Sequence, residues 1–353
     1  MSGVASMALA MLAPLLMMDG AQAALQFSAG WGMSLDQPAV NASWVNLQFG
    51  VSMEQAVDSY ATSRVPSLYS FAWTELDKSR VTNATAGTCS SRIKRFGNTT
   101  HCKTMREDVE QAWAEAFESI REMIDNGTFI GVFLGDENLW DGTSMQNLST
   151  VSELIKRDWP EAVVYINEAQ DVVHCNFNRL GDPIFEDGQC WPESVDWVGY
   201  DYYCTIPSCT GAYGAAAGWN VQRDGMQTMV YPRLPREDQR VVPTPLGFFW
   251  KTSPFNQSIL NAMDAYCEYN AEKYASWALQ DDRLIGMFPF VWSSSDTMIG
   301  LSNLPRCLAK WVQIGKDVVM KASNLRDRGG PRRYTKRTCP SPEERSKYTW
   351  CSM

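Results

Sequence analysis

The stretch FIGVFLGDENLWD, residues 129–141, decides how this chain is expected to fold. Its first six residues are apolar apart from one glycine. They show neither helical nor alternating periodicity, which is typical of a parallel strand covered on both faces. Gly135 then frees the backbone, and the adjacent carboxylates of Asp136 and Glu137 follow, with Trp140 close behind. The stretch therefore predicts a buried strand that delivers acidic side chains to the edge of a sheet.

The same design recurs in three later segments, 163–166, 195–200 and 284–291, which are apolar runs that end in polar or aromatic residues. The residues at these ends are Asn167 and Glu168, then Asp201, Tyr202 and Tyr203, and finally Trp292. Because the carboxyl ends of parallel strands meet at one edge of a sheet, we expect all these side chains to surround one shared site.

Strand and helix patterns alternate along most of the chain. Strand character is found at 25–33, 44–51, 66–73, 129–135, 162–167, 195–202, 240–247 and 284–291. Helices are expected at 52–62, 104–125, 148–157, 256–280 and 304–322, and a capping box at Thr104 opens the second of them. The alternation predicts an α/β protein with a parallel sheet, and eight strands predict closure into a (β/α)8 TIM barrel.

Cysteine usage points to disulfides. The ten cysteines are an even number and include no CxxC pair of the zinc type, so pairing in an oxidising compartment is favoured over metal binding. Long segments at 78–102, 170–194 and 204–238 carry cysteines and are expected to be disulfide-bonded loops on the rim of the barrel. Cys204 and Cys209 are close enough in sequence to close a small loop together.

Three regions are expected along the 353 residues. Residues 1–23 read as a signal peptide, 24–325 as the barrel and catalytic domain, and 326–353 as a basic tail that contains Cys339 and Cys351. N-glycosylation sequons stand at Asn41, Asn83, Asn98, Asn126, Asn147 and Asn256. These features predict a glycoprotein that is secreted or held in the lumen of the secretory pathway or at the cell surface.

The net charge of −9 disfavours nucleic acid as a partner. The leading apolar run at 4–18 is shorter than the roughly 20 residues that span a bilayer, so no stable membrane insertion is expected. No pattern in the sequence fixes an oligomeric state.

Several kinds of chemistry lack their residues. Only two histidines occur, and no GxSxG elbow or glycine-rich nucleotide-binding motif follows a strand, so neither a metal nor an organic cofactor is expected. Carboxylates and aromatic side chains remain. Cleavage of a glycosidic bond needs one carboxylic acid to protonate the leaving oxygen and a second carboxylate at the opposing centre, while aromatic faces stack on sugars. A carbohydrate is therefore the expected substrate.

The strand ends also resemble a known superfamily. The motifs LGDENLW (134–140), YINEA (165–169), VGYDYY (198–203) and MFPFVW (287–292) look like those of the (β/α)8 glycoside hydrolases, and the resemblance spans roughly residues 25–320. It implies that Glu137 is the general acid on strand four. It also implies that the Asp-Tyr-Tyr ending of strand six and a tryptophan after strand eight surround the sugar. The glutamate nucleophile on strand seven of the large retaining clan has no counterpart in 240–247.

Two mechanisms therefore remain open. The Gly-Asp-Glu sequence at 135–137 is also similar to that of β-N-acetylhexosaminidases, in which the aspartate orients an acetamido group of the substrate. Alternatively, Glu168 supplies the second carboxylate in an inverting or unusual retaining geometry. The predicted catalytic residues are Glu137 and Glu168, with Asp136 and Asp201 in support, and the predicted sugar contacts are Trp140, Asn167, Tyr202, Tyr203 and Trp292. The rival hypothesis is a catalytically inactive barrel that binds carbohydrate or serves as a surface-interaction module.

Overall fold

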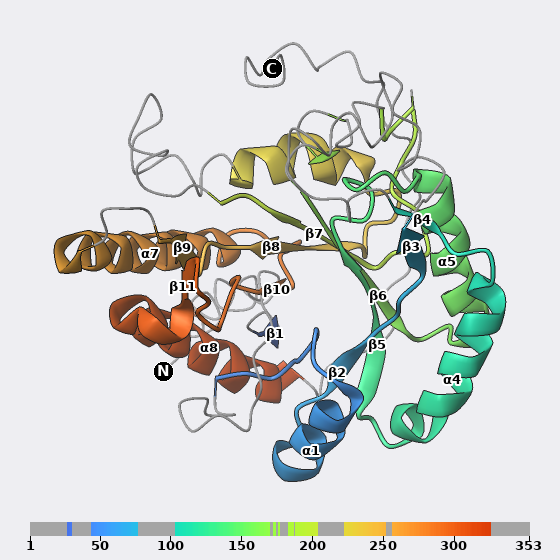
Figure 1. Cartoon of the computed structure of the whole chain (residues 1–353), viewed down its shortest axis with the longest axis horizontal. Helices are drawn as coiled ribbons and strands as arrows, with labels where there is room; N and C mark the ends of the chain where they lie inside the picture. Colours follow the sequence, from blue (N-terminus) through green and yellow to red (C-terminus); the bar gives the residue numbers. More distant parts are fainter. Residues whose placement is uncertain are drawn as a thin grey trace, which may run out of the picture.

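The central feature of the fold is a parallel five-stranded sheet with the strand order β2-β5-β6-β7-β8 (Figure 1). Its strands are β2 (Ser67–Ser70), β5 (Phe129–Asp136), β6 (Val163–Ala169), β7 (Trp197–Asp201) and β8 (Arg240–Thr244). All four neighbouring pairs run parallel. The computed structural model describes residues 27–29, 44–76, 103–169, 172–173, 176, 183–186, 188–203, 222–251 and 256–325, without the side chains of 27, 76 and 319–325. The predicted α/β architecture with a parallel sheet is confirmed.

Further pairings extend the sheet at both sides. β1 (Phe27–Ser28) runs parallel to β10 (Gly286–Met287), and bridges at Leu284 and Phe290 connect the β10 segment to the β8 segment. Residues 44–51, predicted as a strand, form only one parallel bridge, from Gln48 to Ser67. The neighbouring Pro66 accepts a hydrogen bond from the Gln48 N–H but has no N–H of its own to donate, which limits the ladder.

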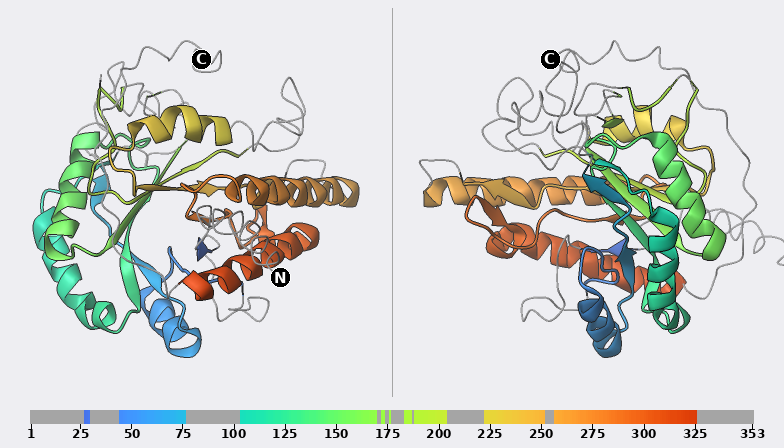
Figure 2. Two further views of the ribbon diagram at one scale, coloured as in Figure 1. Left: turned by 180° about the vertical axis from the view of Figure 1, so that it is seen from behind. Right: turned by 45° about the vertical axis from the view of Figure 1, so that its right-hand side comes forward.

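Among the described residues, five long helices lie outside the sheet (Figures 1 and 2). They are α1 (Met53–Ser63), α4 (Val109–Asp125), α5 (Met145–Asp158), α7 (Gln257–Ala278) and α8 (Pro305–Leu325). The smaller elements are the antiparallel pairs β3 (Thr74–Leu76) with β4 (Lys103–Met105) and β9 (Phe248–Trp250) with β11 (Met298–Gly300), the π-helix η3 (Met226–Val230), and the 3₁₀-helices η4 (Tyr231–Arg233) and η5 (Leu301–Asn303).

Two local predictions were wrong. Helix α4 begins at Val109 with Asp108 as its N-cap, because Thr104 pairs with Glu75 in the β3–β4 ribbon and so cannot open the helix. Part of the segment 204–238, predicted as a loop, is helical at 222–233, where Met226 and the apolar residues after it are buried. Its glycines and prolines favour a loop prediction, although the apolar residues at 226–230 have spacing compatible with a helix.

An inner cluster of buried side chains joins the strands of the parallel sheet to residues of the neighbouring segments. It consists of Ala29, Leu47, Phe49, Leu68, Phe133, Tyr165, Trp197, Val242 and Phe288. Each of the eight segments predicted as strands contributes at least one of them. Aromatic rings meet at its centre, where Phe49 lies 5.4 Å from Phe133 and 5.8 Å from Tyr165 between ring centroids. A second and larger cluster lies between the strands and the helices.

One disulfide is fully described. It joins Cys267 of α7 to Cys307 of α8, and both residues are buried in the larger cluster. Cys190 is also disulfide-bonded. The described bridge connects two helices rather than rim loops, so disulfide bonding of the rim loops stays a prediction. The predicted Cys204–Cys209 loop, the signal peptide at 1–23, the tail at 326–353 and the sequons at Asn41, Asn83 and Asn98 lie outside the described residues. None of the described helices is long and apolar enough to cross a membrane.

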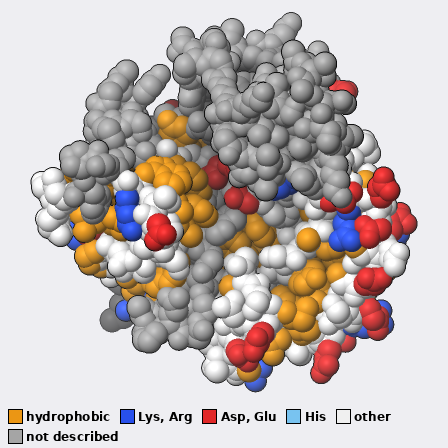
Figure 3. Space-filling view, viewed as in Figure 1, with side chains coloured by type: hydrophobic (Ala, Val, Ile, Leu, Met, Phe, Trp, Pro, Cys, Tyr) orange, Lys and Arg blue, Asp and Glu red, His pale blue; other side chains and the backbone are white. Residues whose placement is uncertain are grey.

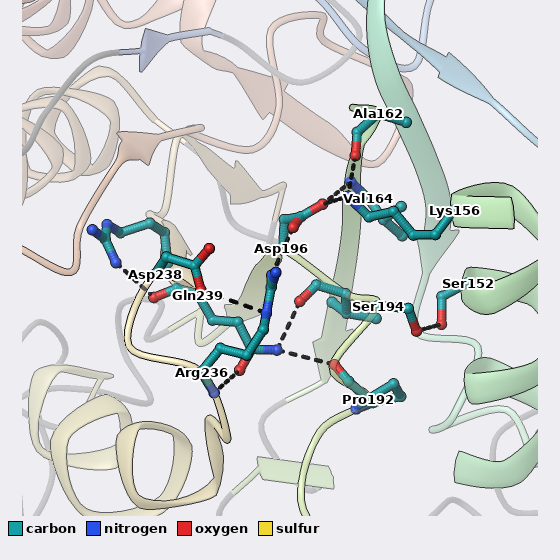
Figure 4. Close-up of polar contacts among 12 residues, drawn as sticks. Ser152, Lys156, Ala162, Val164, Pro192, Ser194, Asp196, Arg236, Asp238 and Gln239 are labelled. Atoms are coloured by element: carbon teal, nitrogen blue, oxygen red, sulfur yellow. Dashed lines mark hydrogen bonds and ion pairs between the residues drawn. The ribbon is translucent and has the colours of Figure 1, made fainter. Parts of the chain in front are cut away.

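A polar network tied together by Asp196 secures the amino ends of β6 and β7 (Figure 4). One carboxylate oxygen of Asp196 accepts the Val164 N–H at 2.9 Å and pairs with Lys156 at 2.7 Å. The other oxygen accepts a 2.7 Å hydrogen bond from Arg236, which precedes β8. The Asp196 side chain is 19% exposed, so these contacts are only partly screened by water. The network therefore holds three consecutive strands in register at the edge opposite the predicted site.

Replacing Asp196 with alanine should lower the free energy of unfolding by about 2–3 kcal/mol, because it removes the acceptor of the Val164 N–H and the carboxylate that Lys156 and Arg236 share. Denaturant titration measures this change. The matched control is Asp224→Ala, which removes an exposed pair with the neighbouring Arg223 and should change stability by less than about 0.5 kcal/mol. Equal effects of the two substitutions would contradict the assigned role of Asp196.

Candidate active site

The turn after β5 positions Glu137. Gly135 has a φ of 102° and Glu137 a φ of 53°, so two left-handed residues bend the chain sharply at the end of the strand. A Cβ at Gly135 would lie 2.6 Å from the side-chain nitrogen of Asn138, which donates a 2.7 Å hydrogen bond to the Leu134 carbonyl. The Asp141 N–H closes the turn on the Glu137 carbonyl at 2.9 Å. The sequence Gly-Asp-Glu-Asn thus forms a compact turn that presents Glu137.

Glu168 ties this turn to the neighbouring strand. Its two carboxylate oxygens accept the backbone N–H groups of Leu139 at 2.9 Å and Trp140 at 3.2 Å. The Glu137 N–H donates to the Asn167 carbonyl at 2.9 Å, which adds a third link between the turn and β6. Glu168 is 0% exposed. Both of its oxygens are therefore engaged with backbone, away from solvent.

Asp136 belongs to a hydrogen-bonded row across three strand ends. The Thr244 hydroxyl at the end of β8 donates to the Asn167 side-chain oxygen at 3.0 Å, and the Asn167 side-chain nitrogen donates to Asp136 at 2.8 Å. Gly199 of β7 makes this row possible. A Cβ there would lie 2.6 Å from the Asn167 oxygen and 2.7 Å from the Tyr165 hydroxyl. The glycine of the VGYDYY motif leaves the space that Asn167 uses to reach β8.

Electrostatic coupling joins the four predicted carboxylates, here called the acidic cluster: Asp136, Glu137, Glu168 and Asp201. Burial raises the pKa of Glu168 and of Asp201 well above the usual range, and the charges of Glu137 and Asp136 raise both further. Burial raises the pKa of Asp136 to about 6, against the opposing effects of the Asn167 hydrogen bond and the Lys103 charge. The raised pKa values favour retention of protons in this cluster at pH values where isolated carboxylates are ionised.

The predicted aromatic contacts occupy two kinds of environment. Trp140, Tyr202 and Tyr203 are half-buried, and the Tyr203 hydroxyl is hydrogen-bonded to Asp201. Trp292 is 1% exposed and packs in the larger cluster. The role of each of these residues in sugar binding stays a prediction. In the space-filling view, acidic side chains reach the middle of one face beside residues that are not described, and others lie over α4 and α5 (Figure 3).

Sequence reasoning missed three residues of this site. Lys103 pairs with Asp141 at 3.0 Å, donates to Asn138 at 3.1 Å, and lowers the pKa of Asp136. It follows a cysteine-rich segment far from β5 in the sequence, so no local pattern marks it. Thr244 and Tyr165 lie within predicted strands. Of the three, only Thr244 could have been found from the sequence, because it is a polar residue at the end of a strand, as the predicted site residues are.

The arrangement is suited to proton transfer. Several carboxyl groups share one strand edge, and burial together with mutual repulsion raises the pKa of three of them, which is how a site keeps one acid protonated beside an ionised neighbour. Within the described residues, no group of His, Cys, Asp or Glu side chains has the geometry to hold a metal ion.

No family model matches the sequence, and neither does any curated protein. Among solved structures, the chain is similar to a GH2 β-galacturonidase from Eisenbergiella tayi, with a TM-score of 0.47, 10% identity, and coverage of 80% of this chain and 46% of that protein. It is also similar to a GH10 xylanase from Thermobacillus composti, with a TM-score of 0.44, 10% identity and coverage of 82% and 97%. A GH18 chitinase from Pseudoalteromonas aurantia gives a TM-score of 0.39, 10% identity and coverage of 83% and 99%.

All three of these similar proteins are glycoside hydrolases by name. The chain spans less than half the length of the β-galacturonidase. Likeness at this level identifies neither a family nor an activity for this chain.

Replacing Glu168 with glutamine should loosen the turn after β5, because an amide nitrogen then faces one of the two N–H groups that the carboxylate accepts. An unpaired buried donor costs about 1–3 kcal/mol, so amide hydrogen exchange at Leu139 or Trp140 should quicken by roughly tenfold or more. The control is Glu153→Gln on α5, an exposed carboxylate that accepts from Ser149. Unchanged exchange in Glu168→Gln would show that the turn does not depend on this carboxylate.

Proposed function

We propose that this chain is a secreted (β/α)8-barrel glycoside hydrolase that cleaves glycosidic bonds by carboxylate general acid/base catalysis. The observation that carries the proposal is the acidic cluster at the carboxyl ends of β5, β6 and β7, where Asp136 has a pKa of about 6. A parallel sheet places this cluster at one edge, and cleavage of an acetal needs an acid and a base together at such a place.

Closure of the sheet into a barrel is part of the proposal. The parallel pairing of β1 with β10, the bridges of the β10 segment to β8, and the bridge from Gln48 to β2 support it. Asn46 lies in the same segment as Gln48. Its N–H donates to the Ser28 carbonyl of β1 at 3.1 Å, so this segment contacts β1 as well as β2. An inner cluster with members from all eight segments is what the filled interior of such a barrel requires.

Within this site Glu137 is the general acid and Asp136 the second carboxylate. Both side chains are partly exposed, whereas Glu168 is fully buried with both oxygens bonded to backbone. Glu168 thus suits a positioning role better than contact with a sugar. Thr244, at the end of β8, bonds to Asn167 and has no carboxylate to act as the nucleophile of the large retaining clan.

The reaction follows from these roles. Glu137 gives its proton to the glycosidic oxygen as the bond from that oxygen to the anomeric carbon breaks. Ionised Asp136 then stabilises the oxocarbenium-like centre, either by activating a water or by orienting an acetamido group of the substrate. Addition of water completes the hydrolysis. Where Asp136 activates the water, Asp136 takes up its proton, and exchange with solvent then restores protonated Glu137 and ionised Asp136; where the acetamido group attacks, Glu137 takes its proton back from the water. Asn167 holds Asp136 in place through its 2.8 Å hydrogen bond.

Secretion is supported by the disulfides at Cys267–Cys307 and at Cys190, which are typical of an oxidising compartment. The sequons and the apolar leading segment are consistent with an N-glycosylated secreted protein.

Replacing Glu137 with glutamine should reduce kcat on glycosides with a poor leaving group by a factor of about 10²–10⁴, because the shape is kept and the transferable proton is lost. Hydrolysis is measured on a panel that includes neutral, acidic and N-acetylated glycosides. Glu110→Gln, on the exposed face of α4, is the matched control and should leave kcat unchanged. Full activity of Glu137→Gln would exclude it as the acid. Binding of a glycoside without turnover by the native protein would favour the inactive carbohydrate-binding barrel.

The pH dependence of kcat/KM should follow the ionisation of Asp136. Because its pKa is raised to about 6 and the ionised form is the active one, kcat/KM of the native protein should fall as the pH drops below about 6. Asp136→Asn should abolish that acidic limb along with most of the activity. A limb near pH 6 that persists in Asp136→Asn would assign it to another group.

The free energy of unfolding should also depend on pH through the ionisation of Asp136. The folded protein holds the Asp136 proton more tightly than the unfolded chain, so its unfolding free energy decreases as the pH rises from about 4 to about 6, and the whole penalty is present above pH 6. Asp136→Asn should therefore gain stability relative to the native protein over that interval, by on the order of 1 kcal/mol, since partial exposure weakens the effect. A constant difference between the two proteins from pH 4 to 7 would contradict the raised pKa.

A further inference from the structure

Trp250 is an unusual tryptophan in this chain. Its side chain is 47% exposed, whereas nine other tryptophans of the described part are buried. It lies on β9, the strand that continues beyond the carboxyl end of β8 and pairs with β11 in antiparallel fashion. Isolated exposed apolar residues are common, so exposure alone assigns no role to it. The rigid support of its ring and the aromatic contacts between this ring and the acidic cluster do indicate a role.

The indole of Trp250 has a rigid support. Trp250 pairs with Met298 across the β9–β11 ribbon, and the next residue, Lys251, donates its N–H to the Thr297 carbonyl at 2.8 Å. The Lys251 ammonium donates to the Ser295 carbonyl at 2.6 Å, which holds the turn before β11 against β9. The ring packs edge-on against Phe248, with 5.3 Å between centroids and an interplanar angle of 90°. An exposed ring held in this way loses little freedom when it binds a ligand.

A run of aromatic contacts connects this ring to the acidic cluster. Phe248, which is 1% exposed, lies 5.1 Å from the Tyr203 ring, and the Tyr203 hydroxyl is hydrogen-bonded to Asp201. Tyr203 also stacks on Phe290 at 5.6 Å, so its ring is fixed from two sides. Trp250 therefore lies two ring contacts from Tyr203, the tyrosine that is hydrogen-bonded to Asp201 of the acidic cluster.

Polar groups accompany the exposed ring. Residues 293–297, with the sequence Ser-Ser-Ser-Asp-Thr, form the exposed turn between the β10 segment and β11. The Ser294 hydroxyl accepts hydrogen bonds from the Gly300 N–H and from the Asn303 side chain, which orders this turn. The Asp296 carboxylate in the same turn is exposed. The turn is tied to the residue after Trp250, and an aromatic face together with hydroxyl and carboxylate groups is a combination that suits a sugar ring, with its apolar C–H face and polar rim.

We propose that Trp250 is a stacking platform for a sugar unit remote from the bond that is cleaved, and that the substrate is an extended oligosaccharide or polysaccharide rather than a single-sugar glycoside. This inference rests on the proposed hydrolase function and deepens it. Stacking on Trp250 strengthens the binding of oligosaccharides and polysaccharides only, because a short glycoside held at the carboxylates does not reach the platform.

The test is oligosaccharide binding by the full-length secreted protein that carries Glu137→Gln, so that turnover does not consume the ligand. Xylohexaose, cellohexaose and chitohexaose, with the corresponding monosaccharides, are titrated by isothermal calorimetry. Adding Trp250→Ala should weaken binding of the preferred hexasaccharide by roughly tenfold and that of its monosaccharide by less than about twofold. Trp250→Tyr retains a ring and should retain most of the affinity, which separates stacking from misfolding. Tyr269→Ala, an exposed aromatic on α7, is the matched control and should change nothing.

The outcomes separate the platform from the proposed function. Hexasaccharide binding that is unaffected by Trp250→Ala, or weakened equally for the monosaccharide, overturns the platform, and failure of all three hexasaccharides to bind overturns it too. If binding depends on Trp250 but the native protein cleaves none of these oligosaccharides, the platform stands and hydrolysis fails. If the native protein hydrolyses a hexasaccharide with kcat/KM unchanged by Trp250→Ala, hydrolysis stands and the platform fails.

Discussion

The carboxyl group of Glu168 connects two neighbouring strand ends, and the geometry of the candidate site depends on this connection. Its oxygens accept the N–H groups of Leu139 and Trp140, which hold the turn after β5 against β6. Burial removes water as a competing partner, so each hydrogen bond would be costly to lose. The same burial raises the pKa of Glu168, and the charges of Glu137 and Asp136 raise it further. One buried side chain thus holds the turn by hydrogen bonds and is electrostatically coupled to the neighbouring carboxylates.

Space for the site comes from residues that lack side chains as much as from those that have them. Gly199 leaves room between β6 and β8 for the hydrogen bond from Thr244 to Asn167, and Asn167 in turn fixes Asp136. Gly135 permits the bend before Glu137. The network around Asp196 secures the same strands at their opposite ends, so stability and chemistry are divided between the two edges of the sheet.

The sequence predicted the strands that carry the site because their apolar runs are long and end sharply in polar groups. The run at 129–135 became β5 and the run at 162–167 became β6, with Asp136, Glu137 and Glu168 at one edge. It could not predict the different surroundings of these carboxylates. Whether Glu168 reaches a sugar or binds backbone depends on how the turn after β5 folds over it, which is a tertiary property. Lys103 and Thr104 show the same limit, because pairing of β4 with β3 overrode a good local helix start.

Release of reducing ends from a panel of oligosaccharides measures whether the acidic cluster breaks glycosidic bonds. Purified native protein and the double variant Asp136→Asn/Glu137→Gln are compared on the same panel at pH 5 to 7, an interval chosen to span the Asp136 pKa of about 6. The native protein is expected to release reducing ends from at least one oligosaccharide, and the double variant is expected to release none. Equal release by both proteins, or binding of an oligosaccharide by the native protein with no release, would contradict this expectation.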